Sequence, residues 1–246
     1  MRKTTVFLLL LLICTLIYGI LTVSPDGHSV ESAVEDYGMP SLPFENGERF
    51  TYEVRYNELK VGEARLSFNG EGELAGKKVY FITLSTTIPS LKDAEDLYAD
   101  KKTFLPLEVH RVIKKRIGFD DRIIERYDQE NFRVDISSKS NLRSRNFTIQ
   151  KKSPIHNAIL LIYSYRAKKD FGNNEKFKVS LPTLDFEVIY SGIEDIDTPL
   201  GKYDAYVFTS DPPKFKLWLS ADEKKIPLKI KNPGTLGYSL VIKSID

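Results

Sequence analysis

From Phe44 to the end of the chain, apolar and polar residues alternate with a period of two, and this alternation constrains the fold more than any other feature. In residues 50–57 the even positions are apolar and the odd positions are polar. This pattern is typical of a half-buried β-strand with one packed and one solvated face. It predicts a strand in which Tyr52, Val54 and Tyr56 share a face.

The same alternation recurs along the body of the chain, with turn signals such as Asn69-Gly70 and Asn232-Pro233-Gly234 between the repeats. Closely spaced short strands joined by tight turns favour an antiparallel sheet that is curled or closed as a barrel. We therefore predict a mainly β fold, an antiparallel curled sheet or half-barrel of roughly ten to twelve strands. The expected strands are 50–57, 61–68, 79–84, 107–113, 117–127, 132–136, 177–181, 186–190, 203–208, 215–219, 226–230 and 236–242.

One segment breaks the alternation and predicts the main helix, at about residues 153–168. Ser153 is the expected N-cap, with Pro154 at the first helical position. Lys168-Lys169 and Gly172 are the residue types favoured at a helix end. The apolar residues between form a wide stripe, so we expect the helix to pack against the concave face of the sheet.

The first 23 residues predict export. Arg2 and Lys3 precede an uncharged apolar run from Val6 to Val23, which is the arrangement of a secretory signal. The run is also long enough to span a membrane, so a cleaved signal peptide and a retained anchor both fit. In either case the body lies outside the inner membrane. We expect a periplasmic or otherwise extracytoplasmic protein, exported or anchored in the inner membrane by residues 6–23, and therefore membrane-proximal.

Residues 24–43 carry four acids, no bases and three prolines, and they predict a flexible linker. We expect the remainder, residues 44–246, to form a single β-rich extracytoplasmic domain. The chain's one cysteine, Cys14, lies in the N-terminal apolar run. Its position excludes a disulfide scaffold, a cysteine nucleophile and a zinc–thiolate site in the body.

Charge is nearly balanced, with 36 Lys+Arg against 34 Asp+Glu and a formal net charge of +2. A dedicated nucleic-acid-binding protein normally has a marked basic excess, so no nucleic-acid partner is expected. Scattered basic clusters are typical of solvated strand faces or blunted sheet edges, and a weak attraction to anionic lipid head groups is the alternative. These clusters are Lys101-Lys102, Lys114-Lys115-Arg116, Arg143-Ser144-Arg145 and Lys151-Lys152.

The sequence contains none of the common catalytic or metal-ligand motifs, so we expect no enzyme, no cofactor and no metal site. Asp93, Glu95 and Asp96 are expected as solvated residues of one loop. His156 is expected as a helix cap or a surface residue. A glycan hydrolase acting through carboxylates is the less favoured alternative, because it needs two acids that face each other across a cleft.

Aromatic residues supply the candidate ligand site. If the sheet is an incompletely closed barrel, part of the aromatic stripe lines an apolar cavity able to take a lipid or acyl chain. Filling of an ordinary core is the alternative. Trp218 points to the opposite face of its strand from Leu217 and is the candidate contact for an envelope protein partner, with the floor of a groove as the alternative. The candidate ligand-binding residues are Tyr52, Val54, Tyr56, Phe215 and Leu217.

A series of short motifs, spread in order over the body, matches a known family. The motifs are Phe44-Glu45-Asn46-Gly47-Glu48, the alternating Phe50/Tyr52/Val54/Tyr56, Val61-Gly62-Glu63-Ala64, Phe104-Leu105-Pro106-Leu107, Tyr163-Ser164-Tyr165-Arg166, Thr198-Pro199-Leu200-Gly201-Lys202-Tyr203-Asp204-Ala205, Leu217-Trp218-Leu219-Ser220 and Ile226-Pro227-Leu228-Lys229-Ile230. With them the chain resembles the bacterial envelope family called "domain of unknown function 3108". The resemblance implies an exported β-rich fold and no established activity. Asn157 departs from it, because an acid is expected there.

More weakly, the expected architecture resembles the half-barrel carriers of lipoproteins and lipids. The leading hypothesis is a non-enzymatic cell-envelope protein. It would bind a hydrophobic ligand, a lipid or an envelope partner in or on a curved antiparallel sheet. The alternative is a structural or assembly factor that acts through protein–protein contacts.

Overall fold

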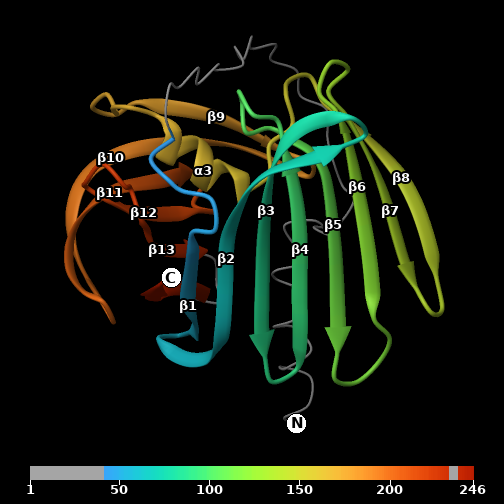
Figure 1. Cartoon of the computed structure of the whole chain (residues 1–246), viewed down its shortest axis with the longest axis horizontal. Helices are drawn as coiled ribbons and strands as arrows, with labels where there is room; N and C mark the ends of the chain where they lie inside the picture. Colours follow the sequence, from blue (N-terminus) through green and yellow to red (C-terminus); the bar gives the residue numbers. More distant parts are fainter. Residues whose placement is uncertain (1–41, 233–237) are drawn as a thin grey trace.

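The computed structural model describes residues 42–232 and 238–246, in which fourteen strands form one antiparallel sheet (Figure 1). The described helix is α3 (Leu160–Ala167). The strands are β1 (Arg49–Tyr56), β2 (Leu59–Leu74), β3 (Lys77–Ile88), β4 (Leu91–Ala99), β5 (Pro106–Lys115), β6 (Asp121–Asp128), β7 (Arg133–Ser140), β8 (Ser144–Gln150), β9 (Lys176–Leu181), β10 (Leu184–Thr198), β11 (Gly201–Asp211), β12 (Lys216–Ser220), β13 (Pro227–Asn232) and β14 (Tyr238–Ile245).

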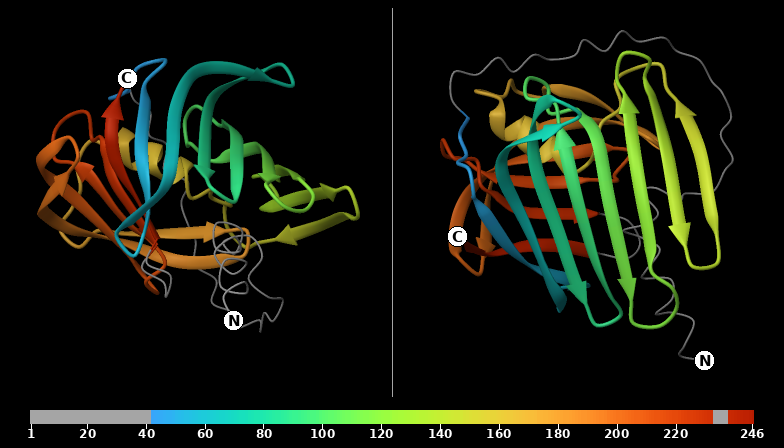
Figure 2. Two further views of the ribbon diagram at one scale, coloured as in Figure 1. Left: turned by 90° about the horizontal axis from the view of Figure 1, so that it is seen from below. Right: turned by 45° about the vertical axis from the view of Figure 1, so that its right-hand side comes forward.

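The strand order places the first and last strands side by side in the middle of the sheet. The order is β8-β7-β6-β5-β4-β3-β2-β1-β14-β13-β12-β11-β10-β9. Val54 of β1 lies opposite Gly62 of β2 and Leu240 of β14. One wing is therefore a meander from β1 to β8, and the other runs from β14 out to β9. The wings curl around α3 without closing, as Figure 2 shows, and β8 and β9 are the two edges of the described sheet.

The alternation in the sequence becomes the two faces of this sheet. On β1, Phe50, Tyr52 and Val54 are fully buried on the concave face. Glu53 and Arg55 lie between them on the convex face and are only partly buried. The Tyr52 hydroxyl donates a hydrogen bond of 3.0 Å to the Pro227 carbonyl oxygen, so this polar group is satisfied inside the core.

The described sheet has more strands than the ten to twelve predicted, and β4 and β8 are the two that the sequence did not predict. Asp93, Glu95 and Asp96 lie on β4, not in a solvated loop, so that expectation is wrong. The acids are compatible with a strand because Asp93 and Glu95 pair with a buried arginine of β5. Strand β8 is polar because it is an exposed edge strand with β7 as its partner in the described sheet.

The helix is shorter than the predicted 153–168, because the residues before it bond to other elements. The Gln129 side chain accepts from the Ile155 N–H at 2.9 Å and donates to the Ile155 carbonyl at 2.8 Å. The His156 N–H donates to the Ser180 carbonyl at 2.6 Å. These backbone groups are therefore unavailable to a helix starting at Ser153.

Asn157 caps the helix instead of Ser153. Its Oδ1 accepts hydrogen bonds from the N–H groups of Ile159 at 2.9 Å and Leu160 at 3.4 Å. His156, just before it, is not a surface residue or a cap. Its Nδ1 accepts a hydrogen bond from the Ser180 N–H at 3.2 Å, and burial lowers the pKa of its imidazole to about 4.

Arg166 fixes α3 inside the curl of the sheet. Its guanidinium is completely buried and makes paired hydrogen bonds of 2.6 and 2.8 Å to the Glu48 carboxylate. It also donates to the Lys224 carbonyl at 3.1 Å and lies 4.7 Å from the centre of the Phe44 ring. The Arg166 cation is therefore matched by one carboxylate. The Lys224 carbonyl accepts a further hydrogen bond from it, and the Phe44 ring packs on its flat face.

Candidate functional site

The predicted ligand-binding residues lie mostly inside the core. Tyr52, Val54 and Leu217 are fully buried, and Phe215 is nearly so. Tyr56 is the half-exposed member of the set and pairs with Tyr238 across β1 and β14. In the described structure Tyr52, Val54, Phe215 and Leu217 pack with the rest of the core, as the alternative of core filling expects. Their contact with a ligand stays a prediction.

Trp218, the predicted partner contact, lies on the convex face of β12 and is largely covered. Its Nε1 donates a hydrogen bond of 3.2 Å to the Glu194 carboxylate. The ammonium groups of Lys216 and Lys229 lie 4.5 and 5.5 Å from the centre of its ring. A partner would have to displace these lysines or bind over them, so this role also stays a prediction.

The best candidate for a functional site is a group of charged side chains on the concave face of β4, β5 and β6. It consists of Asp93 and Glu95 from β4, Arg111 from β5 and Glu125 from β6, and we call it the carboxylate cluster. The register explains how they meet. Glu95 lies directly opposite Arg111, and Glu125 is opposite Val109, two residues before Arg111 on the same face. Asp93, Arg111 and Glu125 are buried, and Glu95 is nearly so.

Arg111 is the cation of the cluster. Its Nε donates to Asp93 Oδ1 at 2.9 Å, and an Nη2 hydrogen bond to Asp93 Oδ2 completes a paired contact. The Arg111 Nε also lies 3.4 Å from Glu95 Oε1. Glu125 accepts a hydrogen bond from the Tyr127 hydroxyl. The cluster thus sets three carboxylates against a single guanidinium among its own members.

The burial of these groups and the excess of acids among them raise the pKa values of several members. Burial, together with the neighbouring carboxylates of Asp93 and Glu125, raises the pKa of Glu95 to about 7, although Arg111 acts in the opposite direction. Burial also raises the pKa of Glu125. The pKa of Tyr127 is raised well above its usual value, first by burial and then by Glu125. The cluster therefore favours a bound proton, a cation or a hydrogen-bond donor.

Two further groups connect the cluster to the rest of the interior. Asn157, the cap of α3, forms a side-chain hydrogen bond to Tyr127. Burial raises the pKa of Tyr238 on β14, and the negative charge of Asp93 adds to that rise. Tyr238 therefore lies within electrostatic reach of the cluster, and its partner across β1 and β14 is Tyr56, one of the predicted ligand residues.

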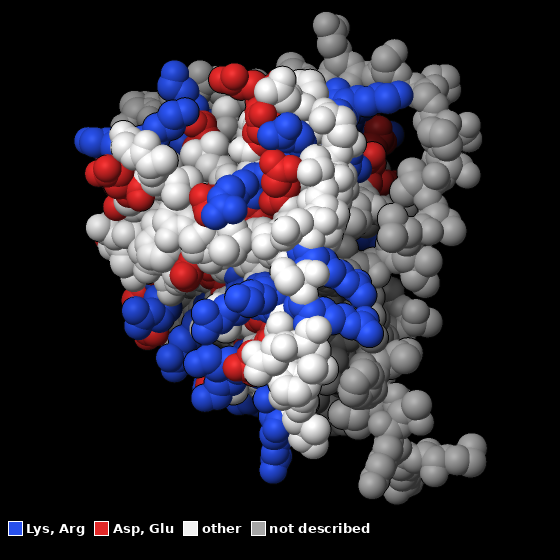
Figure 3. Space-filling view, turned by 90° about the vertical axis from the view of Figure 1, so that its right-hand side faces the viewer, with Lys and Arg blue, Asp and Glu red and all other residues white. Residues whose placement is uncertain are grey.

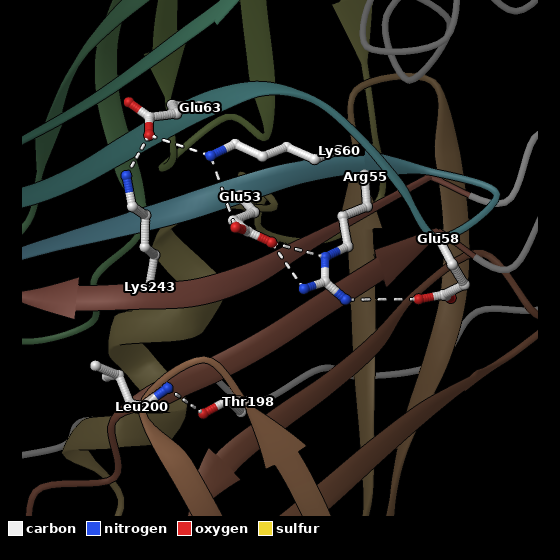
Figure 4. Close-up of polar contacts among 8 residues, drawn as sticks. All are labelled: Glu53, Arg55, Glu58, Lys60, Glu63, Thr198, Leu200 and Lys243. Atoms are coloured by element: carbon white, nitrogen blue, oxygen red, sulfur yellow. Dashed lines mark hydrogen bonds and ion pairs between the residues drawn. The ribbon is translucent and has the colours of Figure 1, made fainter.

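Charged side chains on the convex face behave differently. Figure 4 shows Glu53 and Glu63 of β1 and β2, each contacted by more than one cation. Arg55 bonds Glu53 at 2.7 Å, while Lys60 lies 3.6 Å from both carboxylates and Lys243 also contacts Glu63. The hydrogen bond from Arg55 lowers the pKa of Glu53. These acids are partly exposed and well compensated, so they lack the charge imbalance of the carboxylate cluster.

The cluster was not predicted from the sequence, because Asp93 and Glu95 were attributed to a loop, yet a signal was present. On three successive strands a charged residue takes the phase of the alternation that otherwise carries buried apolar residues. Leu91-x-Asp93-x-Glu95-x-Leu97, Val109-x-Arg111-x-Ile113 and Ile123-x-Glu125-x-Tyr127 show it. Charges in the buried phase of adjacent strands predict a paired interior cluster.

The described residues do not contain a set of side chains arranged as metal ligands. Within residues 42–232 and 238–246, no group of three or more His, Cys, Asp or Glu side chains is arranged to hold a metal ion. His110 is on the convex face, where its Nε2 lies 2.7 Å from the Glu108 carboxylate. In the same residues no helix has the length and apolarity needed to cross a bilayer. The predicted signal or anchor at residues 1–23 and nearly all of the predicted linker at 24–43 lie outside the described residues.

The fold and the interior cluster define a class of protein: a large curled antiparallel sheet around one short helix, with a polar site on its concave wall. The chain belongs to the family described as "Protein of unknown function (DUF3108)", whose pattern matches residues 51–241. The resemblance inferred from the sequence motifs is thereby confirmed. No curated protein matches the chain.

Three solved structures are similar to this chain at very low sequence identity. A β-barrel-like protein of the domain of unknown function DUF1849 from Brucella abortus has a TM-score of 0.49 and 10% identity, with 82% of this chain and 97% of that chain covered. A Parabacteroides distasonis protein assigned as a lipoprotein has a TM-score of 0.34 and 8% identity, covering 87% and 100%. A Bacteroides fragilis protein assigned as exported, with a YmcC-like fold, has a TM-score of 0.30 and 10% identity, covering 83% and 98%.

Proposed function

We propose that this protein is a non-enzymatic, extracytoplasmic binding protein that holds an amphiphilic ligand against the concave wall of its sheet. The observation that carries the proposal is the carboxylate cluster, in which two buried acids, Asp93 and Glu125, and the nearly buried Glu95 lie around one arginine. Burying charges without full compensation costs free energy, so such a group is retained where it does something besides stabilise the fold. The polar part of the ligand binds at the cluster, and its apolar part lies along the neighbouring aliphatic side chains.

The chemistry of the cluster defines the polar part of that ligand. Carboxylates accept hydrogen bonds and attract positive charge, and a Glu95 with a pKa of about 7 exchanges a proton easily near neutrality. A polar group with amine or hydroxyl donors fits these acceptors, whereas a phosphate or carboxylate does not. The strand residues around the cluster, among them Leu97, Val109, Ile113 and Ile123, are buried and apolar and suit an alkyl chain.

The extracytoplasmic location belongs to the same proposal. Its support is the basic start of the chain, Arg2-Lys3, followed by the uncharged run of residues 6–23. The described body also contains no cysteine, which suits an oxidising compartment where an unpaired thiol is a liability.

Native mass spectrometry of the protein isolated from the envelope of its host cell in mild detergent tests the proposal. We expect an adduct whose mass fits an amphiphile with amine or hydroxyl groups. The double variant Glu95→Gln/Glu125→Gln should lose most of this adduct, because it removes the negative charge and part of the acceptor capacity. A chain that carries no adduct when saturating amounts of total envelope lipid are added would contradict the proposal.

The matched control is Glu108→Gln. Glu108 is on β5, as Arg111 is, but on the opposite face, where it contacts His110 and Arg126. It makes the same Glu→Gln change as each of the two cluster substitutions without touching the interior. Equal loss of the adduct in Glu108→Gln would show that net charge, and not the concave site, governs binding.

A glycan hydrolase is the second candidate function, and one observation favours it. Glu95 is held partly protonated near pH 7 beside the arginine-paired Asp93, and two carboxylates in unlike environments are the usual acid–base pair of glycosidases. Release of reducing ends from envelope polysaccharide, abolished by Glu95→Gln and retained in Glu108→Gln, would establish this activity. The absence of release would leave the binding function as the better account.

A further inference from the structure

One end of the sheet carries exposed apolar side chains at the tips of its hairpins. In an antiparallel meander the β1–β2, β5–β6 and β7–β8 turns all lie at the same end (Figure 1). Leu59, Ile117, Phe119 and Leu142 are located there, with 72, 89, 45 and 73% of their surface exposed. Two further large apolar residues of the described chain are exposed, Ile193 and Ile245, and these are not on these hairpin turns. The exposed apolar surface is therefore concentrated at one rim.

The same rim is strongly basic between β5 and β8. Segments 114–122 and 139–145 contain seven lysines and arginines against two aspartates. The two segments are neighbours in the sheet, because Arg122 pairs with Lys139 and Asp121 with Ser140. Figure 3 shows Lys and Arg gathered over the lower part of this side of the molecule, around uncharged side chains that project from it. We call this feature the basic rim.

Among the residues that the structure describes, most cations of the basic rim form no ion pair. Lys115 forms an ion pair of 2.6 Å with Asp121. In the part of the chain that the structure describes, Arg116, Arg122, Arg143 and Arg145 have no ion pair with an acidic side chain. All four are exposed. Free cations around projecting apolar tips are unusual on a surface that contacts only water.

We propose that the basic rim docks the domain on the surface of an anionic lipid bilayer. The exposed side chains of Ile117, Phe119 and Leu142 enter the interface between head groups and acyl chains, and the surrounding arginines and lysines contact the anionic head groups. A surface with basic and apolar side chains side by side binds anionic bilayers, because charge attraction and apolar insertion each add to the affinity. The charge of the rim selects an anionic surface over a neutral one.

An environment-sensitive fluorophore on the full-length chain tests this proposal. In a Cys14→Ser background, Leu142→Cys is labelled with nitrobenzoxadiazole, and the protein is reconstituted into vesicles. One set is pure phosphatidylcholine, and the other is one third phosphatidylglycerol. We expect a blue shift of the probe with phosphatidylglycerol that is lost in half-molar salt, because screening weakens charge attraction at a surface. The N-terminal segment is the same in both sets, so it does not cause the difference.

Two matched controls separate docking from general effects. Glu130→Cys puts the same probe on the β6–β7 turn, at the other end of the same strands, and should show no shift. The triple reversal Arg116→Glu/Arg143→Glu/Arg145→Glu should remove the shift, at roughly fivefold in the docking equilibrium for each basic side chain lost. The reversal Lys77→Glu/Lys78→Glu/Lys102→Glu should keep it, because these exposed lysines lie at the start of β3 and on the β4–β5 turn, at the other end of the sheet. Circular dichroism verifies that each variant is folded. An equal shift on neutral vesicles, or a probe at 142 that stays in water on both, would overturn the proposal.

Discussion

Two arginines are buried in the described structure, and their surroundings differ. Arg166 of α3 donates hydrogen bonds to one carboxylate and one backbone carbonyl. Its guanidinium also packs against the faces of aromatic rings. Arg111, on the wall formed by β4 to β6, bonds Asp93 and lies within reach of Glu95, while Glu125 is close enough for the Arg111 charge to affect its pKa. The first site is matched in charge, and the second has excess acid.

That difference separates a structural ion pair from a candidate functional site. In a matched buried pair each charge is compensated by the other. Changing either partner leaves an uncompensated charge in the interior and destabilises the protein. A site with surplus acid is less stable than it would be with neutral groups, and its free energy falls when a proton, cation or donor arrives. The predictions below test this contrast by removing one charge at a time.

The largest effect is expected at the matched site. Arg166→Met leaves the Glu48 carboxylate without its partner in a largely buried place. Breaking a buried pair in this way costs about 3–5 kcal/mol of unfolding free energy. Urea unfolding of Arg166→Met, Glu48→Gln and the double variant measures it. We expect the double variant to be less destabilised than the sum of the two, and simple additivity would show that the pair has no coupling.

At the carboxylate cluster, removing one charged side chain should stabilise the protein. The pKa of Glu95 is about 7 in the folded state against about 4.5 when unfolded, so the folded state holds the proton more tightly. Stability from this group is therefore present at low pH and lost as the pH rises through 7. Glu95→Gln should unfold at higher urea than the parent chain at pH 8, by on the order of 2–3 kcal/mol, and similarly to it near pH 5.

His156 titrates in the opposite sense and has to be separated from Glu95. Burial lowers the pKa of His156 to about 4, so its contribution is present above pH 6.5 and lost as the pH falls toward 4. Both the parent chain and Glu95→Gln contain His156, so the difference between their pH profiles isolates Glu95. If Glu95→Gln is less stable than the parent at pH 8, the surplus of acid in the cluster is compensated in some other way, and the contrast between the two arginines fails.

Asn157 connects the two regions, because it caps α3 and also bonds Tyr127 beside the cluster. Asn157→Ala should cost about 1 kcal/mol for the lost cap, with any further loss attributable to Tyr127. Thermal or urea unfolding measures this, and Ser153→Ala is the control. If Ser153→Ala costs as much as Asn157→Ala, then the helix start in solution is the one that the sequence predicted.

The sequence predicted the sheet well where residues obey the alternation, as on β1, and poorly where tertiary contacts override local signals. Ser153-Pro154 is a good local helix start, yet the backbone after it is bonded by Gln129 and Ser180, both distant in the sequence. The acids of β4 look like turn residues until Arg111 is placed opposite Glu95. Long-range pairing decides both cases, and the pattern of a single segment does not show which distant residues will be its partners.

The candidate site was predictable only in part for the same reason. The alternation correctly placed Tyr52 and Leu217 on the concave face but could not show that the face is packed around α3 at these positions. The carboxylate cluster required the register of three strands, although charges in the buried phase of each strand gave a hint. The basic rim needed the order of the hairpins, since segments 114–122 and 139–145 become neighbours only in the sheet.

The smallest effect, and the one that most sharply separates the two faces of the sheet, is expected for Glu53→Gln on the convex face. It is the same substitution as Glu95→Gln, but Glu53 is partly exposed and bonded by Arg55, with Lys60 nearby. Its pKa is lowered by the bond from Arg55, so its contribution is present at neutral pH and lost as the solution becomes acidic. We expect Glu53→Gln to destabilise the protein at pH 8 by no more than about 0.5–1 kcal/mol, less in high salt. One Glu→Gln change that destabilises on the convex face and another that stabilises on the concave face, both measured by urea unfolding at pH 8, would show that the interior carboxylates are maintained at a cost to stability. Equal signs at the two positions would remove that reason for assigning a function to the cluster.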